Sequence, residues 1–319
     1  MRKNILRIMI TCLLLSGCAT NEPSLRHDIA LSFDSERIAY NVVGKGKTTL
    51  IFIHGWSCDG RYWQEQTSVF AKNYQVITID LSGHGHSSLN RAEYSMLSFA
   101  KDVQAVIDKE NIDSAILIGH SMGGAVSAEA ARLMPQKVIG IVGIDTLQNV
   151  AKHPPQRAID EMVKPFEADF KNATQILVSS MFLEAADQQL VNWVKEDMSS
   201  APKDIAINAF RQYLGQYTSG EAANVFKGMT TPLVSINARG WPSKYEENKK
   251  HIKNYQLFYI EETGHFPMLV KPKEFNRLLK KAFRTIEPKI DKTYSQAFNT
   301  VPKWSARARS ILPVSRLIN

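Results

Sequence analysis

The chain has 319 residues, of which 44% are hydrophobic, and a formal net charge of +8 at pH 7. It is long and apolar enough to bury a substantial core in one domain, or in one domain with an inserted lid. Basic residues are spread along the chain, and no basic helix with interleaved aromatics or zinc-ligand spacing accompanies them, which argues against nucleic-acid binding. A local excess appears only over 286–319, with six Lys/Arg against two Asp/Glu.

The N-terminus, MRKNILRIMITCLLLSGC, has the pattern of a secretory signal. Three basic residues precede the apolar run Ile8–Leu15, which with its flanks is too short to span a bilayer. The stretch Leu15-Ser16-Gly17-Cys18 resembles a bacterial lipobox. This resemblance implies that residues 1–17 are removed and that Cys18 is diacylated and anchored in a membrane leaflet outside the cytoplasm. The alternative is a plain signal peptide with an incidental cysteine.

Two further expectations follow from this signal. Ala19, rather than aspartate, follows the cysteine, which in such signals goes with the periplasmic side of the outer membrane, and residues 18–29 would form a tether. Cys12 would leave with the signal and Cys18 would carry lipid. Only Cys58 would remain, so the mature domain is expected to have no internal disulfide.

Strand-like and helix-like runs alternate along most of the remaining chain, which predicts an α/β fold with a mostly parallel sheet flanked by helices. The alternation breaks over 146–229, which is expected to be a helical lid between core segments 30–145 and 230–285. Residues 286–319 are expected to be a loosely ordered basic tail. The expected strands are Arg37–Val43, Thr49–Ile53, Gln75–Asp80, Ala115–Ile118, Val138–Ile144, Leu233–Ile236 and Gln256–Ile260, and the expected helices are Tyr62–Lys72, Met96–Lys109, Met122–Leu133 and Pro272–Phe283.

A nucleophile motif follows the strand at Ala115–Ile118. Residues 119–123 read Gly-His-Ser-Met-Gly, a G-x-S-x-G pattern between an apolar strand and a helix rich in small residues. The glycines allow the strand and the helix to approach, and the helix N-terminus favours a developing anion. Ser121 is therefore the candidate nucleophile. The alternative is a turn that only needs glycines.

With these residues the chain resembles the α/β-hydrolases over about residues 30–285. His54-Gly55-Trp56 is similar to the family's oxyanion loop, which implies that the backbone N–H groups of Trp56 and Met122 stabilise an oxyanion. Residues 80–87, DLSGHGHS, match a loop motif of the family, in which we interpret Asp80, His84 and His86 as loop-shaping residues. A metal at the two histidines is the alternative, but no third ligand is evident. We expect neither a metal nor a cofactor.

The candidate base is His265. The segment Gly-His-Phe-Pro follows the last predicted strand and matches the place of the family's catalytic histidine. Its neutral imidazole would take the proton of Ser121 and return it to the leaving group. His120, beside the nucleophile, is interpreted as a structural residue of the elbow.

The acid is absent from its usual place. After the strand at Leu233–Ile236 the sequence reads NARGWPS, without a carboxylate. Asp145 follows the strand next to that of the serine, at the edge where catalytic groups of parallel sheets gather, and some α/β-hydrolases place the acid there. Asp145 is therefore the candidate acid, unless it only caps a helix. The alternatives are Glu246 or Glu247, Glu261 or Glu262, Asp80, or no functional acid.

The resemblance implies a lipid-anchored serine hydrolase, most simply one that cleaves a small or acyl/aryl carboxylic ester through an acyl-enzyme. Thioester, amide and carbon–carbon cleavage run on the same scaffold and stay open. The competing class is a non-catalytic lipoprotein, a hydrolase-shaped binding or assembly module that has lost its acid. A small-molecule ester and, through Cys18, a membrane are the expected partners.

Overall fold

The computed structural model describes residues 24–299, with side chains described up to residue 287. Its centre is an eight-stranded sheet in the order β1-β2-β4-β3-β5-β6-β7-β8. The first two strands are antiparallel to their neighbours, and the other strands run parallel. The strands are β1 (Arg26–Leu31), β2 (Arg37–Val43), β3 (Thr49–Ile53), β4 (Gln75–Ile79), β5 (Ala115–His120), β6 (Val138–Ile144), β7 (Leu233–Ala238) and β8 (Tyr255–Ile260).

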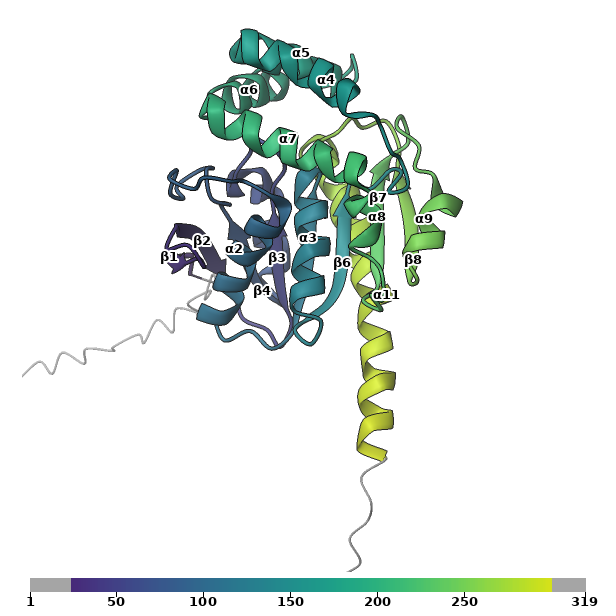
Figure 1. The fold of residues 1–319 in the computed structure, drawn as a ribbon. Helices are drawn as coiled ribbons and strands as arrows, with labels where there is room; N and C mark the ends of the chain where they lie inside the picture. Colours follow the sequence, from purple (N-terminus) through teal and green to yellow (C-terminus); the bar gives the residue numbers. More distant parts are fainter. Residues whose placement is uncertain (1–23, 300–319) are drawn as a thin grey trace, which may run out of the picture.

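Helices cover both faces of this sheet (Figure 1). α2 (Met96–Lys109) and α3 (Met122–Leu133) pack against each other on one face, while α1 (Gln64–Phe70), preceded by η1 (Gly60–Trp63), packs against α11 (Pro272–Asn299) on the other. Strands β3 and β5 are buried along their whole length, which explains their continuous Ile/Leu runs. The predicted α/β architecture is confirmed. Two short helices, α9 (Tyr245–His251) and α10 (Pro267–Val270), flank β8 along the chain.

A helical insertion lies between β6 and β7, above the carboxyl ends of the parallel strands (Figure 1). All of its helices fall within the predicted lid, residues 146–229. They contact the core through the loops that follow β3 and β8, as described below. The lid helices are α4 (Gln156–Ala168), α5 (Phe170–Ser180), α6 (Gln188–Ser199), α7 (Lys203–Ser219) and α8 (Glu221–Asn224).

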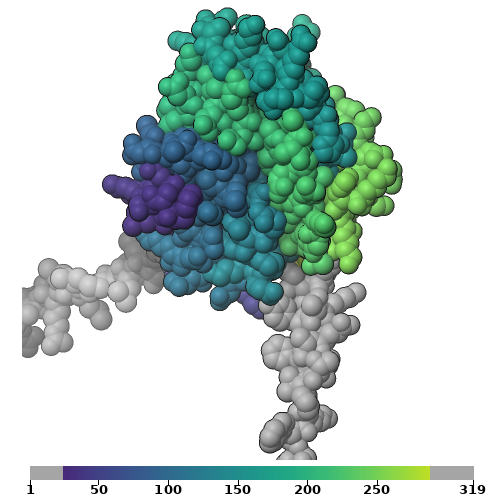
Figure 2. Space-filling model, viewed as in Figure 1, coloured from purple at the N-terminus to yellow at the C-terminus, as the bar shows by residue number. Residues whose placement is uncertain are grey.

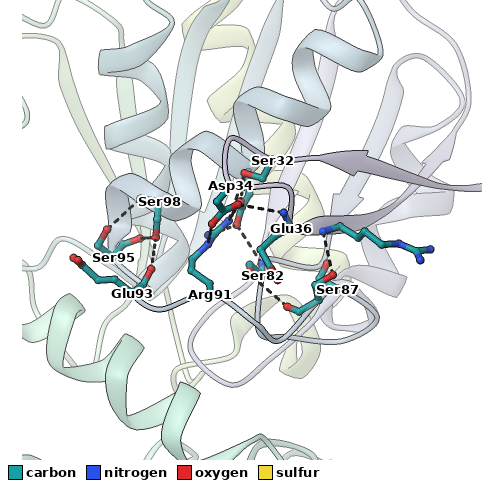
Figure 3. A network of polar contacts seen from close by, with 12 residues as sticks. Ser32, Asp34, Glu36, Ser82, Ser87, Arg91, Glu93, Ser95 and Ser98 are labelled. Atoms are coloured by element: carbon teal, nitrogen blue, oxygen red, sulfur yellow. Dashed lines mark hydrogen bonds and ion pairs between the residues drawn. The ribbon is translucent and has the colours of Figure 1, made fainter.

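A buried ion cluster fixes the turn of the β1–β2 hairpin to the neighbouring loop and helix α2 (Figure 3). Arg91, whose side chain is 3% exposed, donates from Nε to Asp34 (2.7 Å) and from Nη2 to Asp102 (2.6 Å). Ser32 adds a hydrogen bond to Asp102 (2.6 Å). The cluster therefore joins the turn after β1, the loop after β4 and helix α2.

Two predicted boundaries are wrong. Residues 26–29 are not a tether but part of β1, which was missed because charged residues interrupt its short apolar pattern. Residues 286–299 are helical rather than loosely ordered: the helix continues through Pro288 to Asn299, and Ile286 is fully buried in the core. The signal peptide, Cys18 and residues 300–319 lie outside the described residues. Within residues 24–299, no helix is long and apolar enough to cross a membrane.

Candidate active site

Ser121 occupies a sharp turn between β5 and α3. Its backbone has φ = 52° and ψ = −117°, a conformation that is unfavourable for any residue with a side chain. Hydrogen bonds on both sides hold this conformation. The Ser121 N–H donates to the Ile144 carbonyl (3.0 Å), and the Thr146 hydroxyl donates to the Ser121 carbonyl (2.7 Å). The strained turn is thus supported by the end of β6 and the residues after it.

Close backbone contacts explain the glycines around this turn. A Cβ added to Gly123 would lie 2.5 Å from the Ile53 carbonyl oxygen, so only glycine lets α3 approach β3. A Cβ added to Gly55 would lie 3.3 Å from the Cβ of Ser121. The loop that carries Trp56 therefore packs directly against the serine turn.

Asp145 and His265 are hydrogen bonded to each other. The distance from His265 Nδ1 to Asp145 Oδ2 is 2.6 Å, and the carboxylate side chain is fully buried, whereas the imidazole is 14% exposed. Because an ionised carboxylate can only accept, Nδ1 carries the proton and Nε2 is left as the basic nitrogen. This is the tautomer that a histidine needs to take a proton from a serine.

The conformation of the Asp145 residue is set by β7. Its N–H donates to the Ile236 carbonyl (3.0 Å), and its Oδ1 accepts from the Ala238 N–H (2.9 Å), which leaves Oδ2 for His265. Its φ is 42°, in the left-handed region that aspartate tolerates. No helix begins at Asp145, since the next one, α4, begins at Gln156, so the helix-capping alternative does not apply.

Asn237 lies near the end of β7, directly after the predicted strand Leu233–Ile236, where the family's acid usually stands. Its amide makes a reciprocal pair with the backbone of Thr146: Oδ1 accepts from the N–H (3.2 Å) and Nδ2 donates to the carbonyl (2.9 Å). Nδ2 also donates to the Ser243 hydroxyl (2.7 Å). The side chain is fully buried, so these bonds are shielded from water. From the sequence, Asn237 was noted only because no carboxylate stands there. Its hydrogen bonds to the turn after Asp145 were not predicted.

The other candidate acids lie elsewhere. Glu247 pairs with Lys250 on the exposed helix α9, where Glu246 is also exposed. Glu261 pairs with Arg239, and Glu262, which is 84% exposed, pairs with Lys271. Within the described residues none of these glutamates is hydrogen bonded or paired to His265, whereas Asp145 is.

The backbone of His265 is held from two sides. Its N–H donates to the carbonyl of Met181, at the end of the lid helix α5 (2.8 Å). Its own carbonyl accepts from Nε2 of His120 (2.8 Å), and the two imidazole rings lie 4.6 Å apart. A Cβ on Gly264 would lie 2.0 Å from the Met181 carbonyl oxygen, so glycine is required for this contact with the lid.

His120 is a buried, neutral histidine. Because the carbonyl of His265 can only accept, Nε2 of His120 carries its proton. Nδ1 has no hydrogen-bond partner within the described residues. Burial, together with the proximity of His265, places the pKa of His120 well below its usual value. The ring therefore stays uncharged beside His265.

Trp56 links the candidate oxyanion loop to the lid. Its indole N–H donates to the carbonyl of Ala206 in α7 (2.7 Å), and its ring contacts those of Phe166, Phe170 and Phe210 at centroid distances of 4.9 to 6.1 Å. The loop is also held by the core, because His54 Nε2 accepts a hydrogen bond from the Leu81 N–H (3.0 Å). The position of the Trp56 backbone thus depends on lid and core together.

Asp80 shapes its loop. Its carboxylate accepts from the N–H groups of Gly60 (2.8 Å) and His86 (2.9 Å). The two histidines of the motif point apart, since His84 is buried against Ser82 and the His86 side chain is 86% exposed. Over residues 24–299 no group of three or more His, Cys, Asp or Glu side chains is arranged to hold a metal ion.

The segment after β7 places an aromatic ring beside His265. Arg239 turns outward, pairs with Glu261 (3.0 Å) and lies 3.8 Å from the ring centroid of Tyr259. The Trp241 ring meets that of His265 edge-on at 6.0 Å and is 38% exposed. Trp241 therefore borders the partly exposed side of the imidazole.

The model of the alpha/beta hydrolase family matches residues 50–278, more than two thirds of the chain. The chain belongs to the alpha/beta hydrolase family. The match spans the Ser121 elbow, Asp145 and His265, so all three candidate residues lie in the part of this hydrolase that the family model covers.

The matches to individual relatives extend over different shares of this chain. It is 27% identical over 255 residues to the dihydrolipoyllysine-residue acetyltransferase component of an acetoin cleaving system from Pseudomonas putida, covering 75% of this chain and 64% of the relative. It is 32% identical over 126 residues to a pimeloyl-[acyl-carrier protein] methyl ester esterase from Photobacterium profundum, covering 40% and 47%. The chain thus spans less than two thirds of either relative. Among solved structures it is similar to Est816, an N-acyl homoserine lactone degrading enzyme, with a TM-score of 0.68, 25% identity and coverage of 80% of this chain and 99% of the other.

Proposed function

We propose that this hydrolase cleaves carboxylic esters through an acyl-enzyme on Ser121. The observation that carries the proposal is the 2.6 Å hydrogen bond between His265 Nδ1 and the buried Asp145, next to a serine in a strained strand-to-helix turn. This arrangement orients a neutral imidazole and exposes a serine at the same edge of the sheet. A base and nucleophile placed in this way are what acyl transfer needs.

In the proposed reaction, the Ser121 oxygen attacks the ester carbonyl while His265 Nε2 takes the hydroxyl proton. The tetrahedral intermediate then collapses, the bond to the alkoxy group breaks, and His265 returns the proton to the departing alcohol. Water, activated by the same imidazole, attacks the acyl-enzyme and releases the acid and free Ser121. Asp145 holds His265 in the required tautomer and stabilises the imidazolium that forms.

The backbone N–H groups of Trp56 and Met122 are the proposed oxyanion donors. Met122 is the first residue of α3, so its N–H belongs to a helix end that favours negative charge. Gly55 brings the Trp56 loop against Ser121, as described above. Preorganised donors of this kind each contribute about 10²–10³ in rate.

The substrate proposed is a small ester with an apolar acyl or aryl group. The aromatic cluster around Trp56 and the exposed ring of Trp241 beside His265 support an apolar substrate. Two of the similar proteins, the methyl ester esterase and the lactone-degrading enzyme, have names that specify ester or lactone bonds.

The decisive experiment is active-site labelling of the full-length protein with a fluorophosphonate, alongside hydrolysis of p-nitrophenyl esters of increasing acyl length. We expect the wild type to be labelled and Ser121→Ala to be neither labelled nor active. An unlabelled Ser121 in folded protein at neutral pH would instead identify a non-catalytic lipoprotein. Parallel thioester, amide and lactone substrates compare the bond types.

We further propose that the protein is anchored through lipid on Cys18 at the periplasmic side of the outer membrane. The support is the lipobox-like Leu15–Cys18, the preceding signal pattern and Ala19 after the cysteine. In the test, bacteria producing wild type or Cys18→Ser are labelled with a radioactive fatty acid and fractionated. Labelled wild type in outer membranes is expected, and unlabelled wild type in the soluble fraction contradicts the anchor.

A further inference from the structure

Strand β1 carries an apolar stripe on its exposed face. Side chains alternate between the two faces of a strand, and on β1 the even-numbered Ala30 is buried on the side of the sheet that packs on α2. The odd-numbered face bears Leu25, just before the strand, and then His27, Ile29 and Leu31. Its three apolar side chains, Leu25, Ile29 and Leu31, are 54%, 36% and 68% exposed. An edge strand with one solvated face normally carries polar residues there, so this pattern is inverted.

More exposed apolar side chains gather around this stripe. Phe33 in the turn after β1 is 57% exposed and shares a groove of about 470 Å³ with Leu97 at the start of α2. Leu89 is 50% exposed and follows Ser88, which pairs with the backbone of Arg37 opposite Leu31. We name these six residues, Leu25, Ile29, Leu31, Phe33, Leu89 and Leu97, the apolar edge.

Exposed large hydrophobic side chains are concentrated on this flank of the molecule. Of the ten large hydrophobic side chains that are exposed in the described part of the chain, six belong to the apolar edge, and the others are Trp241 and three lid residues. The beginning of the described chain, in purple in Figure 2, stands out from this flank. A concentration of exposed apolar side chains on one flank of a protein indicates an interaction site.

The proposed anchor lies close to this surface. Six residues separate Cys18 from Leu25, so the chain takes seven steps from one Cα atom to the other. Even a fully extended chain of that length reaches only about 25 Å, so a lipid on Cys18 keeps the apolar edge near the bilayer. We propose that the apolar edge docks onto the membrane leaflet that holds this lipid, an inference that rests on the anchoring proposed above.

The charges around the edge indicate how it would bind. Four basic side chains are balanced by four acidic ones. Three ion pairs join members of this set: Arg26 with Asp28, Arg26 with Glu110, and Lys109 with Asp28. Docking is therefore driven by apolar burial and does not require anionic lipid. Lys101 lies 4.2 Å from the Phe33 ring and can extend its ammonium group to the headgroups while the ring enters the leaflet. The balanced residues are Arg26, Arg37, Lys101 and Lys109 against Asp28, Asp34, Glu93 and Glu110.

The test uses full-length, lipid-bearing protein reconstituted in vesicles of phosphatidylcholine. A bimane label is placed on Leu31→Cys or, as the control, on Ile176→Cys in the lid, which is 63% exposed, while Cys58 is buried. We expect a nitroxide on the lipid chains to quench the label at residue 31 and aqueous iodide to lose access to it. The label at residue 176 should show the reverse. Leu97→Cys is a second site if Leu31→Cys fails to fold.

Three results would overturn the proposal. They are equal iodide access at residues 31 and 176, disulfide-linked dimers of Leu31→Cys that show a second copy covering the edge, and quenching that appears only when anionic lipid is added. Wild type that stays soluble and lacks lipid would refute the anchor as well as the docking. Hydrolysis of a soluble ester, measured on the same samples, reports on the proposed catalysis separately, because the apolar edge is not part of the candidate active site.

Discussion

The side chain of His120 supports the backbone of His265: its Nε2 donates to the His265 carbonyl oxygen at 2.8 Å. Removing the donor should let the loop that carries the candidate base shift. We expect His120→Leu to lower kcat by about 10²-fold, as misplacements of about 1 Å do, with little change in KM. His120→Gln, whose amide can donate from a similar position, should retain most of the rate.

Ester kinetics and fluorophosphonate labelling rates check this prediction, with thermal unfolding to show that both variants are folded. A purely structural role of His120 would lower thermal stability without separating the leucine and glutamine variants in kcat. Equal rates for the two variants would therefore contradict the positioning role.

Asp145→Asn tests the candidate acid. Asparagine can still accept from the Ala238 N–H, but it offers His265 an amide in place of a carboxylate and so favours the wrong tautomer. We expect kcat to fall by about 10⁴, by analogy with the same change in a serine protease triad. Glu246→Gln and Glu247→Gln on α9 are the controls and should be near neutral. An Asp145→Asn enzyme with nearly unchanged kcat would remove Asp145 from the mechanism.

Asn237→Asp tests the support of the turn after Asp145. The new carboxylate would face the Thr146 carbonyl, which now accepts from Nδ2, and a buried acceptor would be left unpaired. The free energy of unfolding should drop by about 1–3 kcal/mol, together with kcat. The matched control is Asn254→Asp, because Asn254 also donates to a backbone carbonyl (Thr230, 2.7 Å) but at an exposed site. Urea unfolding measures this free energy. Equal losses in the two variants would contradict the prediction.

Gly264→Ala tests the contact between the lid and His265. The added methyl group would lie 2.0 Å from the Met181 carbonyl oxygen, so the lid and the histidine loop must separate. We expect lower thermal stability and lower kcat. Gly240→Ala is the control, since a Cβ there meets nothing within 4 Å. If the two alanine variants behave alike in melting temperature and kcat, the close contact is not needed.

Because several histidines are buried and neutral in the folded protein, its free energy of unfolding depends on pH. Burial lowers the pKa values of His54 and His120, and that of His84 to about 3 from the usual 6.5. Below pH 6.5 the unfolded chain binds protons that the folded protein excludes, so stability falls as pH decreases. A histidine with a folded-state pKa as low as that of His84 should remove up to about 1.4 kcal/mol per pH unit.

Urea unfolding between pH 7.5 and 5 measures this slope. His84→Gln should flatten it by the share of one histidine, whatever its effect at neutral pH. His86→Gln, at a side chain that is 86% exposed, should leave the slope as in the wild type. An unchanged slope in His84→Gln would contradict the assignment of this residue as neutral in the folded state.

The parallel core of the fold could be predicted because its strands are continuous apolar runs with glycine-rich turns. The first strand could not, since β1 buries only one of its faces and shows its apolar residues to solvent. Likewise, Pro288 and the polar composition after Ile286 suggested an ending that the helix does not have. That prediction was based on local composition and did not include the burial of Ile286 in the core.

In the candidate site, Ser121 and His265 were predicted from motifs that resemble those of the family, and Asp145 from the order of the strands together with the same resemblance. The supporting contacts could not be found in this way. His120, Asn237 and Met181 act on residues 145, 91 and 84 positions away in the chain, and all three bonds involve backbone carbonyls that any residue type provides. Only the tertiary structure brings such groups together.

The lid carbonyls of Met181 and Ala206 also set a condition for engineering this protein. A lid taken from another family member could change which molecules reach the candidate site, but it would have to present two backbone oxygens at the same places, one for the His265 N–H and one for the Trp56 indole. Grafts that match only helix lengths would break both bonds. Chimeras should therefore retain two segments of the present chain, namely the C-terminal end of α5 with Met181 and the start of α7 with Ala206.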